Sequence, residues 1–328
     1  MPAVAIARLR TELECLYVAP FGAPATWRKI RQVLEEMERS AGVSTTGDLT
    51  PPAIARWIGA FPSRSHATAF TLLSSLRRAC TYACSQGWLY SSPFDFRKLR
   101  DWLRDYEPAD REAPRHHSIA DLGRVLGVLA AESADGWQNH RLFALVATTA
   151  MTGARAREVQ AARVEDFDLA ERVFWIRGND RRRLKTKRSK RRVPLTAEAV
   201  RILADWLPQT RSVWAFPGAR FTSPWTSGSP GQKPLDCLKA VGLRCGIVGL
   251  TFQSLRHSFI THSAGPWRVP DLISQRIAGH TSRATTDGYR GYDSSNMSAA
   301  VECISFGLKL PTTEGDKRHG QQGQAQSS

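Results

Sequence analysis

The first part of the chain carries apolar side chains at a helical period. In residues 25–42 the apolar positions recur every three or four residues, which places them on one stripe of a helix. Thr26 is expected to cap this helix at its N-terminus, and Gly42 is expected to end it. The stripe consists of Trp27, Ile30, Val33, Leu34 and Met37.

Two further helices are predicted nearby, which makes residues 1–104 a helical domain. Thr50 stands before two prolines, and the first turn of a helix tolerates proline, so a helix is expected to start there. Residues 65–88 form a longer helical segment. Its Arg77 and Arg78 lie off the apolar stripe and could face phosphate or solvent. The apolar positions of the two segments are Ile54, Trp57, Ile58, Leu72, Leu73, Leu76, Cys80 and Ala83.

A charged, proline-bearing stretch without apolar periodicity follows, and it predicts a linker over residues 105–116. Ser118 then precedes an apolar-periodic segment and has Asp121 three residues later, which resembles a capping box. Residues 140–151 are almost entirely apolar and predict a buried helix that ends at Gly153.

The period then changes from helix to strand. Val173–Ile176 predicts a strand, residues 178–180 a turn, and residues 191–195 a returning strand. More helices are expected up to Leu310, so residues 117–310 form a second domain and residues 311–328 a disordered, low-complexity tail. The predicted fold class is mainly α with a small antiparallel β-sheet.

The charge balance indicates a polyanionic partner. The 328 residues contain 46 Lys and Arg against 30 Asp and Glu, a net charge of +16 and a pI of about 10.2. No stretch approaches about 18 continuous apolar residues, and the N-terminus is charged too early for a secretory signal, so no membrane partner is expected. Six scattered cysteines without a CxxC pair indicate reduced thiols in a cytosolic protein. No Walker A, GxGxxG or HExxH pattern occurs, so no cofactor or metal is expected.

Two candidate segments for chemistry contain basic residues. In "TGARARE", Arg155 follows a Thr-Gly break, and Glu158 one turn later is spaced to hold the turn or the side chain of the arginine. In the predicted hairpin, nine of the twelve residues from Arg181 to Arg192 are basic, with Lys185 and Lys187 near the tip. Such a run is usually solvated, but this one lies between two segments that are predicted to fold.

Two more candidate segments follow in the second half of the chain. "TFQSLRHSFITH" places Gln253 one turn before Arg256 on a predicted helix. "AGHTSRATTDGYRGY" contains His280, Tyr289 nine residues later, and Tyr292. Tyrosines at helical spacing are usually packing residues, so this last segment carries little weight by itself.

Together and in this order, the four segments resemble the tyrosine recombinase (phage integrase) family. The family reads TGxRxxE, a lysine in a β-hairpin before a VPL-like strand, HxxR with LRH, and GH followed nine residues later by the nucleophilic tyrosine. This sequence has "TGARARE", "LKTKRSKRRVPL", "QSLRH" and "GHTSRATTDGY". The resemblance implies a two-domain architecture, in which a helical, SAM-like core-binding domain and an α+β catalytic domain clamp duplex DNA.

The resemblance also implies a reaction without metal or ATP. Tyr289 would attack the phosphodiester and form a 3′-phosphotyrosine, with Tyr292 as the only substitute. Arg155 and Arg256 would bind the non-bridging oxygens as bidentate guanidiniums. His280 would complete this group.

A lysine of the hairpin would protonate the leaving oxygen. Lys185 fits the sequence motif of the family better than Lys187, and both lysines remain candidates for this role. The other basic residues of the hairpin are expected to contact phosphate or to face solvent.

One position departs from the family pattern. Gln253 stands where the family has the first histidine of HxxR. Glutamine can donate a hydrogen bond to a phosphate oxygen but cannot act as a base. Proton removal from the tyrosine is therefore in doubt, and His280 would matter more.

The resemblance implies double-stranded DNA as partner and a homotetramer on DNA, in a bacterial or phage cytoplasm at the nucleoid. It also allows for an accessory DNA-bending protein. A helical stripe near the C-terminus could pack on its own domain or on a neighbouring subunit, and the two alternatives are equally weighted. The stripe consists of Met297, Val301, Ile304 and Leu308.

Two rival functions remain open. A type IB topoisomerase-like enzyme would act as a monomer with the same catalytic residues. The separate helical domain and the TGxRxxE motif favour a recombinase. A DNA-binding protein derived from a recombinase, impaired in cleavage, has only Gln253 in its support.

Overall fold

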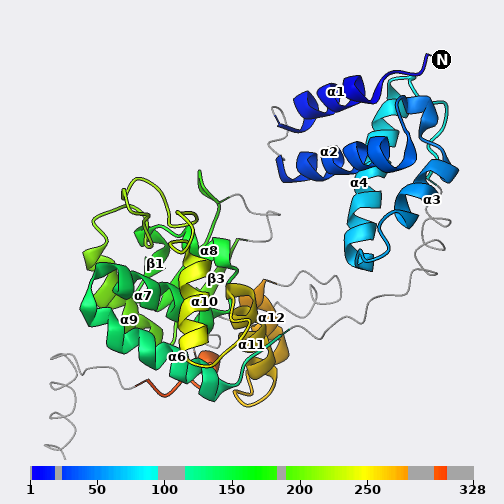
Figure 1. The fold of residues 1–328 in the computed structure, drawn as a ribbon. Helices are drawn as coiled ribbons and strands as arrows, with labels where there is room; N and C mark the ends of the chain where they lie inside the picture. The colour runs from blue at the N-terminus through cyan, green and yellow to red at the C-terminus, as the bar shows by residue number, and fades with distance from the viewer. Residues whose placement is uncertain (1, 19–23, 95–114, 183–189, 280–298, 309–328) are drawn as a thin grey trace, which may run out of the picture. The chain divides into compact units, whose positions relative to one another are not determined.

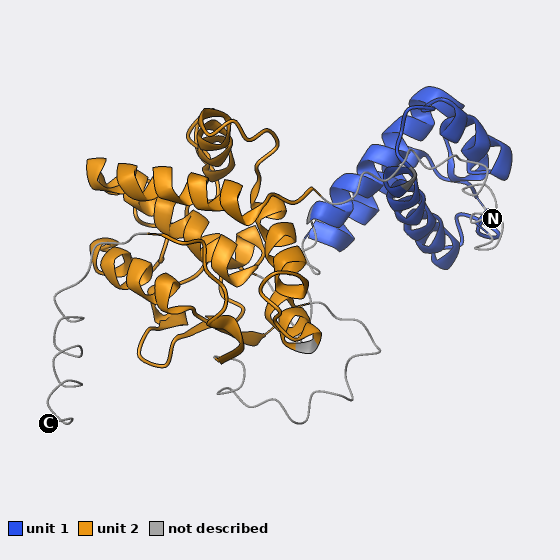
Figure 2. Cartoon of the chain, turned by 90° about the horizontal axis from the view of Figure 1, so that it is seen from below, with its two compact units in different colours: residues 1–112 blue, residues 113–328 orange. Residues whose placement is uncertain are grey.

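The computed structural model describes residues 2–18, 24–94, 115–182, 190–279 and 299–308. The chain divides into two compact units, residues 1–112 and 113–328, which Figure 2 draws in blue and orange. Residues 105–114 of the predicted linker and the predicted tail, 311–328, lie outside the described residues. No helix within the described ranges is long and apolar enough to cross a membrane.

Unit 1 is a bundle of helices around α2 (Figure 1). Helix α2 packs against α1, α3 and α4, and the predicted apolar stripes supply most of the core, with Ile58 only partly buried. Helix α1, which no stripe predicted, adds Ile6, Leu9 and Leu13. Trp57 and Leu76 are among the side chains that are fully buried there. The elements of unit 1 are α1 (Ile6–Val18), α2 (Pro24–Ala41), the 3-10 helix η1 (Thr46–Asp48), α3 (Pro51–Gly59) and α4 (His66–Ser85).

The predicted caps of unit 1 have different outcomes. Thr50 caps α3, as predicted, because its hydroxyl accepts a hydrogen bond from the Ala53 nitrogen at 3.4 Å. The prediction of Thr26 as a cap was wrong, since α2 begins two residues earlier, at Pro24. Proline has the backbone angle that a first helical turn requires, so the helix already starts there.

Unit 2 is built around the buried helix α7 (Trp137–Thr152). Helices α6, α9, α10 and α11 all pack against it, and its residues from His140 to Thr152 are buried, as predicted from their apolar sequence. The Ser118 hydroxyl accepts from the Asp121 nitrogen at 3.0 Å and caps α6. The other elements are α6 (Ile119–Glu132), η2 (Ser133–Asp135), α8 (Ala156–Gln160), η3 (Val164–Asp166), α9 (Ala197–Trp206), η5 (Leu207–Gln209), α10 (Pro234–Arg244), α11 (Phe252–Ala264) and α12 (Asp271–Ala278).

A three-stranded antiparallel sheet completes unit 2 and confirms the predicted fold class. Its order is β1-β2-β3, with Phe174 opposite Val193 in the register of the two longer strands. The predicted turn at 178–180 lies slightly later, at 179–182. The strands are β1 (Phe167–Asp168), which the sequence pattern did not indicate, β2 (Val173–Ile176) and β3 (Arg191–Pro194).

The end of the described chain packs on unit 2 itself. Val301 and Ile304 are buried in the core of this unit, and Leu308 packs against it. The Glu198 carboxylate of α9 accepts from the Phe306 nitrogen at 3.5 Å and from the Leu308 nitrogen at 3.2 Å. The described part of the predicted stripe therefore docks within its own subunit, and it is helical only as far as Val301. Met297 lies outside the described residues.

Candidate active site

Glu158 binds both the backbone and the side chain of Arg155, the two contacts that their spacing allows. One carboxylate oxygen accepts from the Arg155 backbone nitrogen at 2.9 Å, and the other accepts from Nη1 of its guanidinium at 3.1 Å. Burial by itself raises the pKa of Glu158, but hydrogen bonds and charge from Arg191 and Arg155 outweigh burial and lower it. Glu158 is therefore an anion inside the protein, while the Arg155 side chain is 47% exposed.

Gly153 joins α7 to this turn and contacts α11. Its φ of +58° ends α7 in the left-handed conformation that glycine adopts readily. A Cβ here would lie 2.2 Å from Cδ1 of Phe259, so only glycine allows α11 to approach this closely. The Gly153 carbonyl accepts from Nη1 of Arg256 at 2.7 Å. The Thr-Gly break thus positions both candidate arginines.

Arg256 lies deep in the unit, on the buried side of α11. Only 4% of the residue is exposed. Burial, to which the charge of Arg155 adds, lowers the pKa of Arg256 to about 10. The guanidinium therefore remains charged at neutral pH.

Three arginines converge on the C-terminal end of α12. The carbonyls of residues 277–279 accept one hydrogen bond each, from side chains of three different elements. The carbonyl end of a helix carries partial negative charge, so cations stabilise it. The bonds run from Arg191 Nε to Ile277 at 2.8 Å, from Arg256 Nη2 to Ala278 at 2.6 Å, and from Arg155 Nη2 to Gly279 at 3.2 Å.

Arg191 corrects an expectation about the basic hairpin. The expectation that the other basic residues contact phosphate or face solvent was wrong for Arg182 and Arg191, which are 4% and 9% exposed. Arg191 binds both oxygens of Glu158, Nη1 at 3.0 Å and Nη2 at 2.7 Å. The period of a strand was the available signal, because Val193 faces the core and Arg191, two residues earlier, shares its face.

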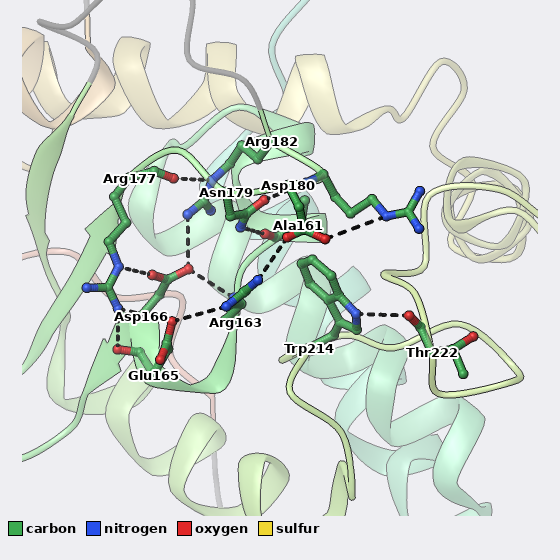
Figure 3. Close-up of polar contacts among 11 residues, drawn as sticks. Ala161, Arg163, Glu165, Asp166, Arg177, Asn179, Asp180, Arg182, Trp214 and Thr222 are labelled. Atoms are coloured by element: carbon green, nitrogen blue, oxygen red, sulfur yellow. Dashed lines mark hydrogen bonds and ion pairs between the residues drawn. The ribbon is translucent and has the colours of Figure 1, made fainter.

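Arg182 anchors the other end of the basic hairpin (Figure 3). Its guanidinium binds Asp166, which is 1% exposed, at 3.0 Å, and the Glu158 carbonyl at 2.5 Å. Arg177 binds the second oxygen of Asp166 at 2.6 Å. Both ends of the hairpin therefore rest on Glu158, one on its carbonyl and one on its carboxylate. Further contacts at this base are Arg163 to Asp180 at 2.9 Å and Asn179 to the Ala161 carbonyl at 2.8 Å.

Gln253 lies on the exposed part of α11, one turn before Arg256. Its amide nitrogen is 2.9 Å from Nε2 of His257. An amide nitrogen can only donate, so the ring nitrogen of His257 accepts. His257 is a neighbour that the sequence analysis did not single out.

His117 fixes the entry of the chain into unit 2 onto α11. Its backbone nitrogen donates to the Ser258 hydroxyl at 2.9 Å, and its ring Nε2 lies 3.1 Å from the Ser254 hydroxyl. Its carbonyl contacts Nε2 of His262 at 2.7 Å. These partners lie four residues apart on one face of α11, so the entering chain follows that helix.

The remaining candidate residues lie outside the described residues. They are Lys185, Lys187, His280, Tyr289 and Tyr292. The described candidates, Arg155, Arg256 and Gln253, belong to one region of unit 2. Within the described part of the chain, no group of three or more His, Cys, Asp or Glu could hold a metal ion.

Comparisons with known proteins define the class of this fold and site. The family model described as "Phage integrase family" matches residues 128–295, which is half of the chain. The chain belongs to this family, the tyrosine recombinases.

Two curated relatives are tyrosine recombinases named XerC. The protein of Pseudomonas fluorescens is 28% identical over 210 residues, which cover 62% of this chain and 67% of the relative. The protein of Herpetosiphon aurantiacus is 30% identical over 189 residues, which cover 56% and 58%. The chain thus matches about two thirds of the first relative and less of the second.

Solved structures share the fold at low sequence identity. The Tn1549 transposon integrase in complex with transposon right end DNA has a TM-score of 0.64 at 15% identity, with 98% of this chain and all of that chain covered. A lambda integrase tetramer bound to a Holliday junction has a TM-score of 0.58 at 17% identity, with 87% and 79% covered.

Proposed function

We propose that the protein is a site-specific DNA recombinase that cleaves and rejoins duplex DNA through a 3′-phosphotyrosine at Tyr289. The observation that carries the proposal is the convergence of Arg155 and Arg256. They come from different elements, and both reach the end of α12, at residues 278–279, directly before His280. This arrangement supports a common site for three of the four family segments, the last of which is described only at Gly279.

Two guanidiniums suit the chemistry of a phosphodiester. Its pentavalent transition state carries negative charge on the non-bridging oxygens, which Arg155 and Arg256 would neutralise. Preorganised donors of this kind are worth about 3–4 kcal/mol each. Gln253 would add a neutral donor to a phosphate oxygen, which makes it less critical than either arginine.

In the proposed reaction, the Tyr289 oxygen forms a bond to phosphorus and the bond from phosphorus to the 5′ oxygen breaks. The phenol has an ordinary pKa of about 10 and must lose its proton, for which His280 is the proposed acceptor. Lys185 would donate a proton to the 5′ oxygen as it leaves. One phosphate ester replaces another, so no energy source is required.

The proposed substrate is double-stranded DNA, with strand exchange in a homotetramer. The charge of +16 supports a binding energy that is mainly electrostatic. The lambda integrase neighbour is a tetramer bound to a Holliday junction, which supports the same assembly here. The proposed role of unit 1 is that of the core-binding domain.

A nicked duplex tests the proposal. The binding site is first selected from a pool of randomised duplexes, and the nick is placed so that the cleaved end diffuses away and traps the adduct. We expect a covalent DNA adduct with the wild type and with Tyr292→Phe, and none with Tyr289→Phe, which should still bind the site. Peptide mass spectrometry locates the phosphotyrosine. An adduct on Tyr292, or an active Tyr289→Phe, would overturn the mechanism.

The nicked duplex also distinguishes the recombinase from the two rival functions. A wild type that binds its site but forms no adduct would support the cleavage-impaired binding protein. An adduct without exchange between two duplexes would support the topoisomerase-like enzyme. A 5′-phosphorothiolate, whose sulfur leaves without a proton, should rescue Lys185→Ala, whereas rescue of Lys187→Ala instead would move the general acid to Lys187.

A further inference from the structure

We propose that Arg191 is a positioning residue for the cleavage step, which keeps Arg155 available for the phosphate by binding Glu158. This inference rests on the proposed function. The side chain of Arg191 lies inside unit 2 and has a partner at each guanidinium nitrogen, Nε at Ile277 and Nη1 and Nη2 at Glu158. It acts through other residues rather than on DNA.

The first step concerns the charge of Glu158. This buried carboxylate binds two guanidiniums, those of Arg191 and Arg155. Arg191 takes both oxygens in a fork, while Arg155 makes a single side-chain contact, at 3.1 Å. A buried carboxylate without a full partner is costly, so it attracts the nearest available cation.

Removal of Arg191 would therefore change Arg155. Among the described residues, only the side chains of Arg191 and Arg155 bind the Glu158 carboxylate. Without Arg191, Glu158 would therefore draw the whole Arg155 guanidinium into a two-pronged ion pair. An arginine bound in this way has fewer free N–H groups and less net charge for a phosphate. Arg191 prevents this by satisfying Glu158 first.

The second step concerns the end of α12. The φ of Gly279 is +69°, and a Cβ there would lie 2.9 Å from Cζ of Arg191. The guanidinium thus lies directly against this turn and also binds the Ile277 carbonyl at 2.8 Å. Arg155 donates to the Gly279 carbonyl at 3.2 Å, so Arg191 supports both partners of Arg155.

The test compares two forms of the nicked duplex. One has an ordinary phosphodiester at the cleaved position, and the other has a methylphosphonate, in which a methyl group replaces a charged oxygen and reduces the need for a guanidinium. In single-turnover cleavage, Arg191→Ala should be slowed about 100-fold on the phosphodiester, the scale of a misplacement of about 1 Å. On the methylphosphonate it should approach the wild type, as Arg155→Ala should.

A double variant sharpens the test. If Arg191 acts through Arg155, the variant with both Arg155→Ala and Arg191→Ala should be no slower than Arg155→Ala alone. Arg201→Ala is the matched control, since Arg201 is an exposed arginine on α9 of the same unit and lies outside the basic hairpin. It removes the same charge and should leave the cleavage rate of bound DNA unchanged.

Arg191→Lys keeps the protein testable if Arg191→Ala does not fold. Lysine preserves the buried charge but cannot form the fork to Glu158. A smaller loss, again confined to the phosphodiester, is expected. Equal losses on both substrates, or additive losses in the double variant, would overturn the inference. A wild type that forms no adduct would instead overturn the proposed function, whereas slow Arg155→Ala with normal Arg191→Ala would overturn the inference alone.

Discussion

Unit 1 and unit 2 differ in what they bury. Among the described residues, the buried charge of unit 1 is the single carboxylate of Glu36, in a core of apolar stripes. Unit 2 buries three carboxylates and four guanidiniums within its described part, which are Glu158, Asp166, Glu198, Arg141, Arg182, Arg191 and Arg256. Burying ions rarely adds stability but fixes charges in place. The difference indicates that apolar packing holds unit 1 together, whereas unit 2 also depends on buried charges whose partners keep its turns and strands in place.

The largest expected effect is at Glu158. Glu158→Ala leaves the buried guanidinium of Arg191 without its carboxylate and should lower the free energy of unfolding around α8 and β3 by about 3–5 kcal/mol. Hydrogen exchange of the full chain, followed by mass spectrometry, measures this locally. Glu171→Ala, at an exposed carboxylate of the same unit, is the control. A loss below about 1 kcal/mol would mean that the ion pair is not structural.

Glu36 offers the corresponding change in unit 1. Its carboxylate accepts from Nε1 of Trp57 at 2.9 Å and pairs with Arg64 at 3.0 Å. Glu36→Ala should cost about 1–3 kcal/mol, because one buried donor loses its acceptor while Arg64 keeps its contact with the ring of Phe61. The same exchange measurement, with exposed Glu14→Ala as control, reports it. A larger loss of unfolding free energy for Glu36→Ala than for Glu158→Ala would contradict the difference between the two units.

Acid should affect the stability of the wild type more than that of Glu158→Gln. The pKa of Glu158 is lower in the folded protein than its ordinary value of 4.5, so ionised Glu158 stabilises the fold above pH 4.5, and this contribution is lost as the pH falls below that value. Chemical denaturation at several pH values should therefore show wild type and Glu158→Gln approaching each other below pH 4.5. A gap that widens toward acid would have the wrong sign.

The smallest effects are expected at the helix caps. The Ser118 hydroxyl accepts its hydrogen bond at 3.0 Å and the Thr50 hydroxyl at 3.4 Å. Ser118→Ala should cost about 1 kcal/mol in unit 2, and Thr50→Ala less in unit 1. Thermal unfolding of the full chain, with the two transitions assigned by hydrogen exchange, compares them. The reverse order would show that cap distance does not control these helix ends.

Periodicity made most of the fold predictable. The apolar stripes predicted α2, α3 and α4 but not α1, the long apolar run predicted α7, and the change of period predicted β2 and β3. The contact between Arg155 and Glu158 follows from their spacing, since side chains three residues apart on a helical turn are neighbours. Local patterns such as these depend little on the rest of the chain.

Other features depend on partners far away in the sequence. The strand period indicates the buried face of Arg191 through Val193, but nothing within the basic run distinguishes Arg182 until Asp166 is brought against it. Strand β1 has only two residues, too few for a period to show. The stripe after Val301 looked helical from its spacing, but the carboxylate of Glu198 binds its backbone in a non-helical form.

The anchoring of His117 has a mechanical consequence. Arg115 is the first residue of unit 2 that the structure describes, and two residues later His117 is bound to Ser254, Ser258 and His262 of α11. The segment that contains His117 therefore cannot shift without shifting α11. This helix also carries Arg256, so a displacement at His117 would reach that guanidinium through a single helix.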